Sequence, residues 1–135
     1  MNWHPWRWAL HHHPHTPITI CALPDDLDGA WTTQGIFLSD RLGQTGRRVT
    51  LTHELVHLHR GPAVHGIPHI EERAVDALTA RLLIPLERLA DALAWCGWQA
   101  NDECAEELWV DLPTLLDRIA GLTPIEREWL ESKAR

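Results

Sequence analysis

The segment His53-Glu54-Leu55-Val56-His57 has the pattern HExxH. In a helix, side chains four residues apart lie on one face, so the imidazoles of His53 and His57 would converge on one metal ion. Glu54 would lie near that ion without binding it, where a general base for a metal-bound water belongs. The pattern therefore predicts zinc-dependent hydrolysis, and the alternative is an ordinary helix edge carrying two histidines.

A catalytic zinc ion needs a third protein ligand and keeps its fourth position for water. The downstream candidates are side chains with a nitrogen or oxygen donor: His59, His65, His69, Glu71, Glu72 and Asp76. The spacing HExxHxxGxxH is excluded, because Arg60 and Ala63 stand where that pattern needs glycine and histidine. We expect His65 and His69 in a connecting loop at the mouth of a cleft.

A carboxylate on the next predicted helix is the better third ligand. Glu72 and Asp76 are four residues apart and would share one helix face. We expect Glu72 to bind the metal and Asp76 to accept a hydrogen bond from the far nitrogen of a ligand histidine, which would fix the ring orientation. Glu71 is the competing ligand, but it would point to another side of the helix and be solvated.

The elements that position these residues follow from periodicity and turn signals. Two strands are expected at 18–23 and 31–39, antiparallel to each other, with a bulge at Gly35. A helix is expected from Arg47 to the stop at Gly61-Pro62, and a second one over 70–84, ended by Pro85. Four short helices follow, at 86–95, 102–109, 113–120 and 124–134.

This order of elements predicts an α+β fold. A small antiparallel sheet would pack on a zincin-like HExxH helix and a glutamate helix, followed by a C-terminal helical bundle. With 135 residues we expect one domain, with a core at about 17–85 and the helical part at about 86–135. The last helix is introduced by Thr123-Pro124-Ile125-Glu126, which predicts a capping box.

Composition narrows the class of protein. The net charge of −7 gives no overall basic footprint for nucleic acid. Cys21, Cys96 and Cys104 form no CxxC pair, which is typical of reduced thiols in a cytoplasmic protein. No stretch predicts a transmembrane span or a signal peptide.

Tryptophan and histidine are the unusual residues, with eight and ten copies. Histidines 11, 12, 13 and 15 lie at the end of a short helix expected over 6–12 and just after it, and we expect a flexible surface segment that binds metals weakly. In the C-terminal third we expect four tryptophans to fill the helical bundle; the alternative is an aromatic docking patch. They are Trp95, Trp98, Trp109 and Trp129.

Residues 105–119 have the rhythm of a helix-turn-helix. DNA binding would require basic side chains on the second helix. Between Asp102 and Ala120 the only basic residue is Arg118, against six acidic ones, so phosphate would be repelled. We therefore expect this part to pack on the core or to bind a protein partner.

The combined pattern resembles the ImmA/IrrE-type zinc metallopeptidases. TLTHELVHLHRG is followed by IEERAVDALTARLLIP, so HExxH precedes a glutamate helix ending in an LLxP-like stretch, and the resemblance covers about 31–85. The chain looks like the small members of actinobacteria and their phages. The resemblance implies a gluzincin-like peptidase in which His53, His57 and Glu72 bind zinc and Glu54 is the base. One departure is Ala74, where many members have a second Glu.

The resemblance implies a cytoplasmic endopeptidase whose protein substrate is a repressor-type transcription regulator. Two other classes remain open: a metal-binding regulatory protein without turnover, and a helix-turn-helix DNA-binding protein. Retention of Glu54 favours catalysis, because a site that only binds metal would not need it. The oxyanion of the tetrahedral intermediate needs a donor; without any tyrosine, that donor would be His65, His69, an arginine or a tryptophan.

Overall fold

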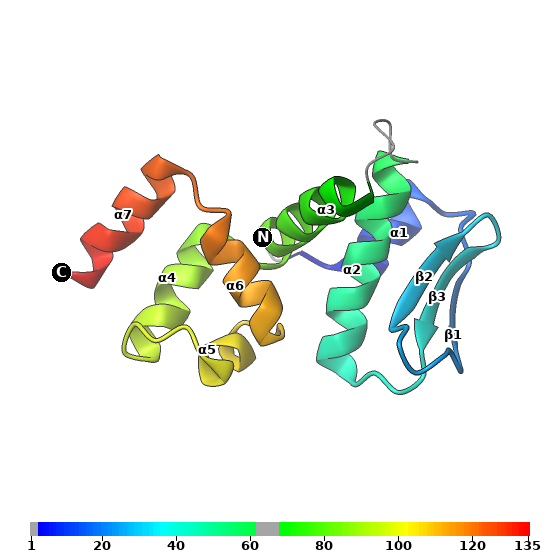
Figure 1. Cartoon of the computed structure of the whole chain (residues 1–135), viewed down its shortest axis with the longest axis horizontal. Helices are drawn as coiled ribbons and strands as arrows, with labels where there is room; N and C mark the ends of the chain where they lie inside the picture. Colours follow the sequence, from blue (N-terminus) through cyan, green and yellow to red (C-terminus); the bar gives the residue numbers. More distant parts are fainter. Residues whose placement is uncertain (1–2, 62–67) are drawn as a thin grey trace.

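The computed structural model describes residues 3–61 and 68–135. The described elements are, in order, α1 (Pro5–His12), β1 (Ile18–Cys21), β2 (Gly29–Thr32), β3 (Gly35–Ser39), α2 (Gln44–Arg60), α3 (Pro68–Leu83), α4 (Leu86–Trp95), α5 (Asp102–Glu107), α6 (Leu112–Ala120) and α7 (Pro124–Ala134). The predicted α+β class is confirmed. Figure 1 shows α2 between the sheet on one side and α3 on the other, with α4 to α7 beyond α3. No helix in this part of the chain is both long and apolar enough to cross a membrane.

The sheet is mixed, not antiparallel as predicted. Its strand order is β1-β3-β2, and the central strand β3 pairs in parallel with β1 and antiparallel with β2. Ile36 of β3 is aligned with Ile18 of β1 on one side and with Trp31 of β2 on the other. β2 is therefore an edge strand, and α2 packs against β2 and β3.

The predicted strand over 31–39 is two strands joined by a tight turn. β2 ends at Thr32 and β3 begins at Gly35, whose φ of +122° favours glycine. The hydroxyl of Thr32 accepts a hydrogen bond from the backbone N–H of Gln34 at 3.1 Å, which stabilises the turn. Gly35 thus ends a hairpin and does not form a bulge. The hairpin leaves one edge of β3 free, and β1 pairs with that edge in parallel. This pairing makes β3 the inner strand.

Two apolar clusters hold the elements together. The first lies between the sheet, α1 and α2, and it contains Ala9, Ile36, Leu38, Leu51 and Leu55. The second joins the end of α3 to α4, α5, α6 and α7, with Leu89 and Leu115 fully buried at its centre. The first cluster fixes α2, which carries the HExxH residues, against the sheet.

Helix limits agree well with the local signals. α4 and α7 begin and end where predicted, and the capping box between Thr123 and Glu126 is present. α2 ends at Arg60, and the residue that caps it, Gly61, has a φ of +79°. α5 stops at Glu107, two residues before the predicted end, which is within the usual fraying of helix ends. α2 begins at Gln44, three residues before the predicted Arg47.

The predicted burial of the C-terminal tryptophans is right for two of the four. Trp98 and Trp129 are partly buried and pack against the second cluster. Trp95 and Trp109 are 74% and 67% exposed, so that prediction is wrong for them. Trp95 is the last residue of α4, and Trp109 follows α5 with a left-handed φ of 58°; both therefore lie at helix ends, outside the apolar stripes.

Candidate metal centre

α2 brings the two histidines of HExxH together at its part-buried edge. The ring centroids of His53 and His57 are 4.8 Å apart. On the opposite side of the helix, Leu51 and Leu55 are almost completely buried against the sheet. The apolar residues of α2 thus fix its orientation, and the two imidazoles face α3.

α3 supplies a carboxylate to both imidazoles. Nε2 of His53 lies 2.7 Å from Oε1 of Glu72, and Nε2 of His57 lies 3.1 Å from Oε2 of Glu72. The donor atoms of the three residues all lie within 4.8 Å of one another. Among residues 3–61 and 68–135 they are the one group of three such side chains close enough to hold a metal ion.

The three donors fit a single divalent ion. Two imidazoles and one carboxylate form the ligand set of a catalytic zinc site, which leaves the fourth position open. The carboxylate of Glu72 contacts the Nε2 atoms of both rings, so the donors already point to a common centre. The side chain of Glu72 is 48% exposed, which leaves that centre accessible to solvent.

Asp76 lies on the same side of His53 as Glu72. Its Oδ1 is 3.1 Å from Nε2 of His53, whereas Nδ1 of that ring lies 3.4 Å from Oε1 of Glu54. The predicted contact of Asp76 with the far ring nitrogen is therefore wrong. The reason is that α3 passes the Nε2 side of the ring, so both of its carboxylates approach from there.

Glu54 is buried, with 7% of its surface exposed. It lies under the edge strand β2, where Gly29 allows a close approach. A Cβ atom at Gly29 would lie 3.4 Å from Cγ of Glu54 and 2.5 Å from Cγ2 of Thr50. The carboxylate beside the metal centre is thus held by a strand that touches α2 through a glycine.

A second residue of β2, Trp31, stacks beside His57. The ring centroids are 6.5 Å apart and the rings are tilted by 16°. Gly29 and Trp31 are two residues apart in a strand and face the same side, towards α2. Neither contact is predicted from the sequence, because the predicted strand begins at Trp31 whereas β2 begins at Gly29. The signal for the earlier start is the spacing of Gly29 and Trp31, two residues apart in the chain.

The centre concentrates negative charge around His53. Burial lowers the pKa of His53, but the hydrogen bond to Glu54 and the charges of Glu54, Glu72 and Asp76 outweigh it and raise the pKa to about 9. Three carboxylates around one imidazole favour a positive charge at this position. A proton satisfies that preference, and so does a divalent cation.

The other candidate ligands lie elsewhere. Glu71 forms a two-point ion pair with Arg60, at 2.6 and 2.9 Å, and its side chain is 19% exposed, so it is not simply solvated as predicted. His69 is exposed in the first turn of α3, not in a loop. His65 lies outside the described residues. His59 faces His13, with 3.4 Å between Nδ1 and Nε2.

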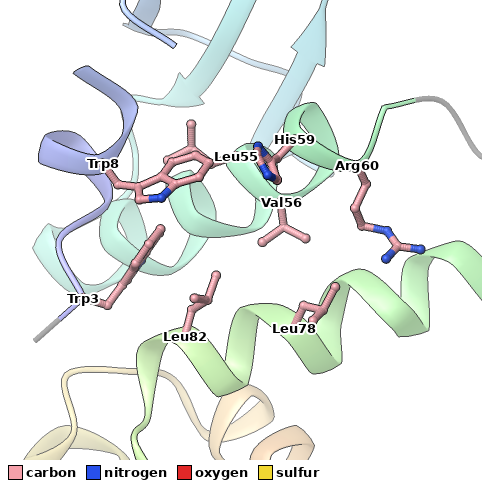
Figure 2. A pocket seen from close by; sticks show the side chains of 8 residues that line it. All are labelled: Trp3, Trp8, Leu55, Val56, His59, Arg60, Leu78 and Leu82. Atoms are coloured by element: carbon pink, nitrogen blue, oxygen red, sulfur yellow. The ribbon is translucent and has the colours of Figure 1, made fainter. Parts of the chain in front are cut away.

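A separate apolar pocket lies beside the metal centre without sharing its residues. Its volume is about 220 Å³. Figure 2 shows Val56 of α2 facing Leu78 and Leu82 of α3, with Trp3 and Trp8 closing one end. Beside the metal centre, α2 and α3 thus also face each other through apolar side chains, next to the N-terminal segment.

The helix-turn-helix-like segment over 105–119 does not present a basic side chain at its surface. Arg118 is 3% exposed, and its Nε donates a hydrogen bond to the carbonyl of Ile84 at 2.7 Å. The single basic residue of the helix-turn-helix-like segment therefore supports the packing of α6 and is not available to phosphate. The burial of Arg118 strengthens the expectation that this segment does not read DNA.

Comparison with protein families agrees with the site. A family model of the peptidase M78 group, described as the IrrE N-terminal-like domain, matches residues 20–119. No curated protein and no solved structure gives a match. The matched region includes most of the sheet, the HExxH helix and the glutamate helix, which confirms the resemblance to the ImmA/IrrE type. The chain is a metallopeptidase of the M78 family.

Proposed function

We propose that this metallopeptidase is a zinc-dependent endopeptidase in which His53, His57 and Glu72 hold the metal. The observation that supports this is the convergence of two imidazoles and one carboxylate, with donor atoms within 4.8 Å, beside the buried Glu54. Zinc is the ion we propose because two histidines and one glutamate are a ligand set of zinc hydrolases.

Zinc held by these residues would polarise the scissile carbonyl and lower the pKa of a water molecule bound to it. Glu54 would accept a proton from the attacking water while the oxygen of that water forms a bond to the carbonyl carbon. It would then give the proton to the nitrogen as the C–N bond breaks. The contact of Glu54 with Nδ1 of His53, at 3.4 Å, helps to orient its carboxylate. Asp76 would add negative charge next to the bound metal, because its carboxylate lies 3.1 Å from Nε2 of the same ring.

The substrate we propose is a repressor-type transcription regulator in the cytoplasm. The resemblance to ImmA/IrrE-type enzymes supports this substrate class. The acidic net charge and the buried Arg118 argue against binding of this chain to DNA. We further propose that the whole chain acts as one unit, with α4 to α7 packed on the end of α3 through the second apolar cluster.

The proposal is tested by producing the chain together with the transcription regulator encoded next to it. Wild type should release a defined fragment of the regulator. Glu54→Gln should bind metal as well as wild type but cleave at least about 100-fold more slowly, because the general base is lost. Glu128→Gln, an exposed residue of α7, is the matched control and should cleave normally.

Metal analysis completes the test. His57→Ala should lose most of the zinc that wild type retains, measured by mass spectrometry of the native protein. Equal cleavage by wild type and Glu54→Gln would refute the role of Glu54. Unchanged zinc content in His57→Ala would show that the metal is bound elsewhere.

A further inference from the structure

Four arginines line a groove that is distinct from the metal centre. The groove has a volume of about 1000 Å³ and lies where the N-terminal segment and α1 meet the beginnings of α2 and α4. The arginines come from three helices: Arg7, Arg47, Arg48 and Arg88. None of the described residues that line it is acidic, although the whole chain carries a net charge of −7.

No ion pair among the described residues involves the positive charge of this groove, which the four arginines supply. Nε of Arg47 is buried without a hydrogen-bond partner. Arg48 and Arg88 line the same groove, and burial and then the charge of Arg88 lower the pKa of Arg48. Uncompensated like charges oppose folding, so their retention points to a binding role.

Aromatic side chains accompany the arginines. Trp109 lines the groove and is 67% exposed, and its left-handed backbone (φ 58°) is unfavourable for a residue of this size. Nη1 of Arg48 donates a hydrogen bond of 3.0 Å to the carbonyl of Trp109 and holds it there. Trp6, 39% exposed, also lines the groove. Tryptophan and arginine are the residues that contribute most often to protein-binding hot spots.

We propose that this groove binds an acidic, partly apolar segment of a protein partner. Carboxylates of that segment would pair with the guanidinium groups, and its apolar side chains would pack on Trp6 and Trp109. The proposal rests on charge complementarity between the groove and an acidic segment. This binding would need neither the metal centre nor hydrolysis.

A peptide fits this groove better than a nucleic acid does. Leu108 and Trp109 directly follow α5, whose exposed face carries Asp102, Glu103, Glu106 and Glu107. A phosphodiester chain that left the groove on this side would meet four carboxylates, which would repel it. A short acidic peptide can end within the groove and avoid them.

The experiment measures the binding of a labelled peptide of alternating glutamate and leucine by fluorescence anisotropy. The full chain carries Glu54→Gln so that the peptide stays intact. Peptides with glutamine or lysine in place of glutamate are compared at the same salt concentration. We expect the glutamate peptide to bind most tightly, with an affinity that falls as salt rises.

Two charge reversals locate the peptide. Arg7→Glu and Arg88→Glu change exposed side chains and should each weaken binding at least about tenfold. Arg135→Glu, at the exposed C-terminal end of α7, is the matched control and should bind as the parent does. Unchanged thermal melting of the three variants checks that the fold is retained.

Four results would overturn the proposal. The first is equal binding of the glutamate, glutamine and lysine peptides. The second is a loss of binding in Arg135→Glu as large as in Arg7→Glu. The third is tighter binding of a single-stranded oligonucleotide than of the acidic peptide, which would assign the groove to nucleic acid. The fourth is a dimer in sedimentation that Arg88→Glu abolishes, which would assign it to a second copy of the chain.

Discussion

Nε2 of His53 lies 2.7 Å from Oε1 of Glu72, although the two residues belong to different helices. The same carboxylate reaches His57 through its other oxygen, at 3.1 Å. The candidate metal centre therefore depends on the packing of α3 across α2. The same packing directs the neighbouring Glu71 to Arg60 and not to the histidines.

We expect Glu72→Gln to reduce zinc affinity at least about 100-fold, because loss of a ligand should exceed the 10- to 100-fold typical of residues that only support a ligand. Glu71→Gln is the matched control, since it makes the same change one residue away, at a side chain that pairs with Arg60 and is not part of the metal centre. Competition with a chromogenic chelator measures both affinities. Equal losses in the two variants would contradict the assignment of Glu72.

Asp76→Asn should weaken zinc binding about tenfold while the fold stays intact, because a carboxylate next to the metal-binding nitrogen of His53 loses its charge. The affinity is measured by the same chelator competition, with circular dichroism as a check on folding. Asp91→Asn, an exposed residue of α4, is the control. An affinity equal to that of wild type would mean that the charge of Asp76 does not support metal binding.

Gly29→Ala should destabilise the protein by roughly 1–3 kcal/mol, because the new methyl group would lie 2.5 Å from Cγ2 of Thr50 and push β2 away from α2. Urea unfolding measures the change. In the Gly29→Ala background, Thr50→Ser removes Cγ2 and should restore most of the stability. Gly43→Ala, where a Cβ meets no atom within 4 Å, should change little. Failure of Thr50→Ser to restore stability would refute this contact as the cause.

Glu126→Gln should lower stability at neutral pH by roughly 1–2 kcal/mol, because Arg118 is buried and loses its charged partner. The hydrogen bond from Arg81, together with those from Thr123 and Arg118, lowers the pKa of Glu126 from 4.5 to about 2. A carboxylate with a lowered pKa stabilises the folded state above its ordinary pKa and loses that effect as the pH falls.

The difference between wild type and Glu126→Gln should therefore be constant above pH 4.5 and shrink as the pH falls towards 2. Urea unfolding at a series of pH values measures it. Glu128→Gln, an exposed neighbour in α7, should show no such trend. A difference that stays the same down to the lowest pH would contradict the ion-pair explanation.

Local signals in the sequence determined the helices that carry the site. The HExxH spacing puts two imidazoles on one face of α2, Gly61 and Pro85 end the two central helices, and Thr123 caps α7 as predicted. These features could be predicted because periodicity, caps and helix stops act over a few residues and do not depend on distant parts of the chain.

Tertiary packing decided which groups meet. The spacing of Glu72 and Asp76 could not show that both approach Nε2 of His53, since this depends on how α3 crosses α2. The parallel pairing of β1 with β3 depends on the hairpin at Gly35, and the contact of Gly29 with α2 depends on strand order. Such contacts join residues far apart in the chain, and their geometry is set by how the buried faces of whole elements fit together, which residue spacing alone does not encode.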